Sequence, residues 1–197
     1  RQRQMCIRDR TLPTYPLQHI DDHLGEIALC ILSAINVGKV QSDKELEDLC
    51  DLSVRALDEL IDYQEYPVKA AETATRARRS LGIGFIGLAH YLAKLGFKYD
   101  SQEAWDAVHQ LSESFQFYLL KASNNLAKEK GYCENFGRTK YADGILPIDT
   151  YKKDVDEISN PDYQHDWESL RASILEHGLR HSTLSAQMPS ESSSVVS

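Results

Sequence analysis

Cys30 is the residue whose type and surroundings best fit chemistry. It lies within Glu26 to Val37, an apolar and β-branched run that ends at Gly38. Such a run predicts a strand buried on both faces or a short buried helix, and we expect Cys30 to be buried on a strand. A cysteine in this setting is most often a small core residue, and a second cysteine facing it across a sheet would make it redox-active. The four cysteines of the chain lack the CxxC spacing of a zinc site.

Three glycines, Gly82, Gly84 and Gly87, spell the GxGxxG pattern of dinucleotide-binding turns. In such a turn the glycines let a pyrophosphate approach the N-terminus of a helix. A first strand of that fold needs an apolar run before the first glycine, whereas residues 75–80 read TRARRS. We therefore favour glycines that allow a helix to pack closely on a strand. A nucleotide-dependent oxidoreductase using these glycines remains the less favoured enzyme alternative.

Two groups of polar residues have the types of metal ligands. Their members are His19, Asp21, Asp22 and His23 in one group, and His177 and His181 in the other. The first group lies in an expected loop, and Gly178 interrupts the helix that would align the second. We interpret both groups as solvated polar residues and expect no metal.

The C-terminal residues 188–197, MPSESSSVVS, allow two interpretations. One is a disordered, serine-rich tail. The other is a turn after a strand that ends near Gln187, where serine hydroxyls and free backbone N–H groups bind phosphate oxygens.

The elements that position these residues alternate between helices and short strands. Ser42 and Glu45 form a capping box before an amphipathic helix that extends to about Tyr63. A short strand across the glycines precedes a helix that stops at Gly96.

In the second half of the chain, Asp100 and Glu103 form another N-terminal box before a helix of about seven turns that ends at Gly131. Residues 132–163 are mostly connection. Asp166 caps a helix over Trp167 to His177, and residues 181–187 form a last short apolar run. This order predicts a helix-rich α/β protein.

Composition excludes several classes of protein. The 197 residues carry 22 Lys and Arg against 30 Asp and Glu, so the net charge of −8 disfavours a nucleic-acid backbone as partner. The longest apolar stretch is far too short to cross a bilayer, and the N-terminus lacks the shape of a signal peptide. We expect a cytoplasmic protein with no membrane partner.

Four stretches together resemble the large, catalytic subunit of class I ribonucleotide reductase. They are residues 25–38, 55–67, 142–154 and 167–190. The last contains the most diagnostic pattern: Trp167, Leu170, Gly178, Leu179, Arg180, Ser185, Ala186, Pro189 and Ser190. The resemblance implies that residues 11–197 are part of a ten-stranded α/β barrel, truncated at both ends, from an enzyme several times longer.

The resemblance also implies roles for particular residues. The family reduces ribonucleoside diphosphates to deoxyribonucleoside diphosphates by thiyl-radical chemistry, for DNA precursor synthesis, with a cysteine pair as reductant. Cys30 matches one cysteine of that pair, and its partner belongs to an earlier part of the family's sequence. The substrate diphosphate would be held by Pro189, Ser190, Glu191, Ser192 and Ser193. His181 stands where relatives often carry asparagine.

Partners follow from the same resemblance. They are a small (beta) subunit that generates the radical and contains the metal, thioredoxin or glutaredoxin as reductant, and a second large subunit. ATP and deoxynucleotides act as effectors of the parent protein, whereas this segment itself is expected to bind no cofactor.

Residues 1–10, RQRQMCIRDR, resemble the translation of a sequencing adapter, and we exclude them from the fold. The family's radical cysteine would fall at Ile7, flanked by Met5 and Asp9, and Cys6 is one residue out of register. We therefore expect the chain alone to be inactive and prone to association. A helical protein-interaction module is the rival from another class, and it would leave the segments around Cys30 and Leu184 as loops or helix ends.

Overall fold

The computed structural model describes residues 25–188. The elements in this range are β1 (Ile31–Asn36), α2 (Asp43–Tyr63), α3 (Lys69–Arg78), β2 (Leu81–Ile86), α4 (Leu88–Leu95), α5 (Gln102–Lys130), the 3-10 turns η1 (Phe136–Arg138), η2 (Lys140–Asp143) and η3 (Lys153–Glu157), and the helices α6 (Pro147–Thr150) and α7 (Trp167–His177). The expected helix-rich α/β organisation is confirmed, and residues 132–163 are mostly connection, as predicted.

The strands β1 and β2 form a parallel pair, with Ile31 opposite Leu81 and Asn36 opposite Ile86. After α7 the chain returns to the other side of β2, where Ser185 pairs with Ile83, also in parallel. The order across the sheet is therefore β1, β2, then the segment around Ser185. Parallel neighbours need long crossover connections, and helices supply both of them here.

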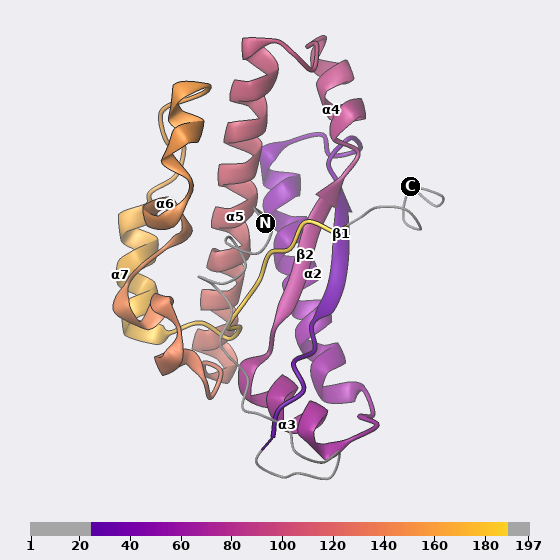
Figure 1. The fold of residues 1–197 in the computed structure, drawn as a ribbon, viewed down its shortest axis with the longest axis vertical. Coiled ribbons are helices and arrows are strands. Elements are labelled where there is room, and N and C mark those ends of the chain that lie inside the picture. The colour runs from indigo at the N-terminus through magenta and orange to yellow at the C-terminus, as the bar shows by residue number, and fades with distance from the viewer. Residues whose placement is uncertain (1–24, 189–197) are drawn as a thin grey trace.

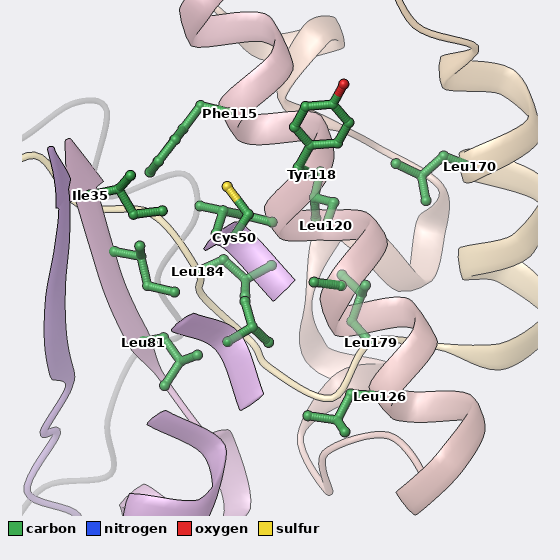
Figure 2. Packing of buried hydrophobic residues seen from close by; sticks show 14 of the residues in the cluster. Ile35, Cys50, Leu81, Phe115, Tyr118, Leu120, Leu126, Leu170, Leu179 and Leu184 are labelled. Atoms are coloured by element: carbon green, nitrogen blue, oxygen red, sulfur yellow. The ribbon is translucent and has the colours of Figure 1, made fainter. Parts of the chain in front are cut away.

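Helices cover one face of this small sheet. Helix α2 packs on β1 and β2, α5 packs on α2, and α7 lies outside α5, so the layers run from sheet to α2 and α5 to α7 (Figure 1). Figure 2 shows the core between them, where Ile35, Leu81 and Leu184 of the sheet side face Phe115 and Leu120 of α5. The core thus lies entirely on the helix side of the sheet.

Side-chain caps fix where three of the helices begin. The hydroxyl of Ser42 accepts a hydrogen bond from the backbone N–H of Glu45 at 3.2 Å, and a carboxylate oxygen of Asp166 accepts one from Ser169 at 3.0 Å. Both caps confirm the predicted starts of α2 and α7. The predicted cap at Asp100 is wrong, because the following residue, Ser101, caps α5. The carboxylate of Glu45 accepts from the backbone of Gln41 rather than from Ser42, so only half of the predicted capping box forms.

Helix α3 was not predicted. Its buried face consists of small side chains, with Ala70, Ala71 and Ala74 each at most 2% exposed. Alanine has the highest helix propensity but gives little hydrophobic contrast, so the sequence reads there only as a basic, polar stretch.

The prediction that residues 26–37 are a strand is confirmed for Ile31–Asn36, but burial on both faces is wrong. Leu32 is 56% exposed. Residues alternate between the two faces of a strand, and within residues 25–188 only the face toward α2 is covered by helices. None of the helices described here has the length and hydropathy needed to cross a bilayer.

Candidate active site

Cys30 directly precedes β1 and is exposed. The prediction of a buried cysteine on a strand is therefore wrong on both counts for the structure of residues 25–188. The ladder begins one residue later, where the N–H of Ile31 donates to the carbonyl of Ser80 at 3.3 Å. By alternation, Cys30 shares the open face of the sheet with Leu32, and this face has no helix over it in the described part of the chain.

The other described cysteines differ from Cys30. Cys50 is fully buried and Cys133 is 2% exposed. Burial raises the pKa of Cys50 to about 12 and that of Cys133 to about 11, so both remain protonated thiols near neutral pH. Cys30 is thus the one described thiol that a reaction partner can reach.

Gly82 and Gly84 lie inside β2, on the open face, because the alternating residues Leu81 and Ile83 point into the core. A methyl group on Gly82 would lie 2.5 Å from Cδ2 of Leu32 and 3.9 Å from Sγ of Cys30. These glycines therefore allow neighbouring side chains to lie flat on the sheet. The predicted packing of a helix on a strand is wrong for them, since their close neighbours come from β1 and from the segment after α7.

The dinucleotide interpretation of Gly82, Gly84 and Gly87 is not supported by this geometry. In that fold the glycines form the turn between strand and helix, whereas only Gly87 does so here, with a φ of 78° as the N-cap of α4. The carboxamide oxygen of Asn36 occupies the space beside it, 2.2 Å from where a Cβ would stand.

The segment after α7 leads directly to the predicted diphosphate residues. The N–H groups of Leu81 and Ile83 donate to the carbonyls of Thr183 and Leu184, both at 2.9 Å, and the N–H of Ala186 donates to Ile83 at 3.1 Å. Side chains hold the same segment from two sides.

One of these side chains is Ser185, whose hydroxyl donates to the carboxamide oxygen of Gln116 on α5 at 2.6 Å. The other is Gln187, whose amide nitrogen donates to the carbonyl of Phe85 at 2.5 Å. These bonds hold the chain up to Gln187. The predicted diphosphate-binding residues 189–193 lie outside the described residues.

A buried charge network lies where β2 begins. The carboxylate of Asp58 accepts from Nε of Arg79 at 2.6 Å, and its Oδ1 is 3.1 Å from Nε2 of His181. The other ring nitrogen of His181 lies 2.9 Å from the hydroxyl of Ser123. Arg180 completes the group, with Nε 3.3 Å from Asp58 Oδ1. The network joins α2, the end of α3, α5 and the segment after α7.

The protonation states in this network follow from burial and pairing. Burial opposes ionisation of Asp58, but hydrogen bonds from His181 and Arg79 outweigh it and hold the pKa of Asp58 below its ordinary value. Burial lowers the pKa of His181 below 6.5, so this ring is neutral at pH 7 and donates its Nε2 proton to Asp58. Both ring nitrogens of His181 are thus engaged within the protein, as a core histidine rather than a metal ligand with His177.

The remaining metal candidates, at positions 19 to 23, lie outside the described residues. Among residues 25–188, no group of three or more histidines, cysteines and acids is placed to hold a metal ion.

A large cleft in the described structure is separate from Cys30. It has a volume of about 1000 Å³ and lies between α5 and residues 147–163, with aromatic walls that include Trp105 and Tyr163. None of the residues near Cys30 lines it. Sequence reasoning missed this cleft, and it missed the roles of Asp58, Arg79 and Met188.

The parallel strands β1 and β2, joined by helices and extended by the pairing of Ser185 with Ile83, place this chain in the α/β class rather than among all-helical interaction modules. A family model described as "Ribonucleotide reductase, barrel domain" matches residues 8–197, and the chain belongs to this family.

The relatives are ribonucleoside-diphosphate reductase alpha subunits. The chain is 59% identical over 197 residues to that of Haemophilus influenzae, which covers 100% of this chain and 26% of the relative. It is 58% identical over 137 residues to the alpha subunit of ribonucleoside-diphosphate reductase 1 of Escherichia coli, a match that covers 70% of this chain and 18% of the relative. The alpha subunit of bacteriophage T4 is 44% identical over 199 residues, and this match covers 100% of the chain and 26% of the relative. The chain thus spans about a quarter of the length of the curated relatives that it matches in full.

Proposed function

We propose that this chain is part of the catalytic subunit of a ribonucleoside-diphosphate reductase and that Cys30 is one of its two reducing thiols. The observation that carries this proposal is the position of Cys30. It is exposed on the open face of the sheet, beside Gly82, and Met188 on the same face leads directly to the predicted diphosphate residues. A thiol and a phosphate-binding segment on one face are what the reduction of a nucleoside diphosphate requires.

The proposed reaction balances as a dithiol oxidation. Cys30 and a second cysteine from another part of the parent protein lose two electrons and two protons and form a disulfide. The ribose 2′ carbon is reduced, and its hydroxyl leaves as water. A thiyl radical on a third cysteine starts the reaction by removing the 3′ hydrogen of the ribose, and the thiol formed there returns this hydrogen at the end, which regenerates the radical. Thioredoxin or glutaredoxin then reduces the disulfide by thiol exchange.

Pro189, Ser190, Glu191, Ser192 and Ser193 are proposed to hold the diphosphate. Proline cannot donate a backbone hydrogen bond, so the sequence favours an end of the pairing with β2 at Pro189, and the N–H groups after it would then be available to phosphate oxygens.

The open face is proposed to line the inside of a ten-stranded barrel. Parallel strands with helices on a single face are suited to this, because closure would turn the open face inward and pair the outer edge of β1. Residues 11–197 would belong to this barrel, and residues 1–10 would be foreign to it. The partners in this proposal are the radical-generating beta subunit, a second alpha subunit and the nucleotide effectors, in the cytoplasm.

The test uses a full-length chimera in which residues 11–197 replace the matching segment of the Haemophilus influenzae alpha subunit. With the beta subunit, thioredoxin and CDP, the Cys30→Ser variant is expected to form no deoxynucleotide over multiple turnovers while CDP binding is retained. Cys133→Ala removes a thiol outside the site and serves as the control. Sustained turnover by Cys30→Ser would overturn the proposal.

A further inference from the structure

The cleft between α5 and residues 147–163, which we call the aromatic cleft, gathers large apolar side chains that remain exposed. Five of them are between 40% and 62% exposed: Tyr99, Trp105, Val155, Ile158 and Tyr163. Soluble proteins rarely leave such side chains together on the surface, and tyrosine and tryptophan are enriched where proteins pack against one another. The cleft therefore has the character of a contact surface.

Hydrogen bonds hold the walls of the aromatic cleft in place. The side-chain amide of Gln102 on α5 donates to the carbonyl of Ile158 at 2.9 Å. The hydroxyl of Ser159 donates to the carboxylate of Asp106, also on α5, at 2.7 Å. The residues opposite α5 are thus tied to the helix across the cleft, so the surface is already formed before anything binds to it.

The rim of the aromatic cleft is acidic. Residues 98–106 and 151–163 contain seven Asp and Glu and three Lys. Two of these lysines are engaged within the rim, because Lys152 pairs with Asp154 at 3.1 Å and Lys153 lies over the ring of Tyr151. Complementary charge favours an occupant with Lys or Arg beside its apolar side chains. It disfavours a second copy of this chain, since a two-fold contact would place the acidic rim against itself.

The length of the relatives indicates where such an occupant comes from. The chain covers 26% of the relative from Haemophilus influenzae, so most of the parent's chain lies outside it. A cluster of exposed aromatic side chains is unfavourable in water at all times, which favours a permanent cover over a partner that binds and leaves.

We propose that the aromatic cleft receives an amphipathic segment of the parent alpha subunit itself, with apolar side chains in the cleft and Lys or Arg on the acidic rim. The aromatic cleft is then an internal interface that fastens the outer side of α5 to another part of the subunit. This inference rests on the part of the proposed function that makes the chain a piece of a longer alpha subunit, and it is independent of the role of Cys30.

Photocrosslinking in the full-length chimera identifies the occupant. The photoreactive residue benzoylphenylalanine replaces Val155 in one variant and Ile158 in another, and the beta subunit is present during irradiation. Mass spectrometry of the digest is expected to show a bond within one alpha chain, to a peptide outside residues 11–197 that contains Lys or Arg. A bond to the beta subunit, a bond to a second alpha chain, or no protein crosslink from either position would overturn the proposal.

A charge reversal tests the basic character of the occupant without a probe. Glu157 lines the aromatic cleft and is exposed. Glu157→Lys is expected to lower the melting temperature of the chimera by about 1–3 °C at low salt and by less than half of that at about 0.5 M salt, because ions screen the repulsion. Glu65→Lys, an exposed position outside the cleft, is the matched control and is expected to cause no such shift.

The sign of the shift is decisive. Without a basic occupant, a lysine at position 157 would meet only the acids of its own rim, and the melting temperature of Glu157→Lys would stay the same or rise. Either result would overturn the proposal, as would an equal decrease in Glu65→Lys. Failure of the proposed role of Cys30 is seen separately, as turnover by Cys30→Ser.

Discussion

Nε2 of His181 lies 3.1 Å from Oδ1 of Asp58, a residue 123 positions earlier in the chain, and both side chains are fully buried. The same carboxylate accepts from Arg79, which adopts a left-handed backbone conformation with a φ of 47° between α3 and β2. Asp58 thus holds Arg79, just before β2, and His181, just before the segment around Ser185 that pairs with β2. The alignment of that segment with β2 therefore depends on one carboxylate of α2.

Replacing Asp58 by alanine is expected to lower the free energy of unfolding by about 3–5 kcal/mol, because it leaves the buried guanidinium of Arg79 without its closest acceptor. The measurement is urea unfolding of the chimeric subunit, followed by circular dichroism. Asp48→Ala is the control, since Asp48 forms an exposed pair with Lys44 on the same helix and such pairs contribute about 0–1 kcal/mol. Equal destabilisation by both variants would contradict the role of the network.

The pH dependence of stability gives a second test. The pKa of His181 is lowered in the fold, so the unfolded chain binds the proton more tightly, and stability is lost as the pH falls below about 6.5. The pKa of Asp58 is also lowered, so its contribution is lost as the pH falls further, below about 3.9. His181→Asn is expected to reduce the slope between pH 7 and pH 5, which one histidine limits to about 1.4 kcal/mol per pH unit. Identical unfolding free energies of parent and variant across this range would refute the assignment of the buried, neutral ring.

Ser192→Ala is expected to weaken the binding of CDP to the chimera by about 1 kcal/mol, roughly fivefold in Kd, because one hydroxyl contact to a phosphate oxygen is lost. Equilibrium dialysis measures this directly, and Ser194→Ala, just beyond the predicted set, is the comparison. Unchanged affinity in Ser192→Ala would argue against a hydroxyl contact at that position.

Local signals predicted most of the elements. Ser42 and Asp166 mark helix starts, and Gly96, Gly131 and Gly178 follow helix ends, because caps and left-handed residues act within a few positions of the backbone they stabilise. The expected arrangement of the segments near Cys30 and Leu184 in one sheet is also confirmed, through β2.

What could not be predicted depends on distant residues. The sequence around Cys30 is apolar on both sides, but exposure is decided by what covers each face of the strand, and the helices described here cover only one. In the buried network, Asp58 is 21 positions from Arg79 and 123 positions from His181, so the network leaves no local pattern in the sequence. The candidate thiol could be found because the family resemblance singles out Cys30, whereas the flat sheet face beside it required coordinates.

The 197-residue chain by itself is expected to form no deoxynucleotide. Reduction consumes two thiols, and among the described cysteines only Cys30 is exposed. Cys50 and Cys133 lie in the core with pKa values raised by burial to about 12 and about 11, so they supply neither a nearby partner nor a reactive thiolate. The measurement combines residues 11–197 with the beta subunit, thioredoxin and CDP, and the full-length chimera at the same concentration serves as the positive control. Deoxycytidine diphosphate above the level of a Cys30→Ser control would show that this chain contains a second reducing thiol, and would contradict the proposal that Cys30 needs a partner from another part of the parent protein.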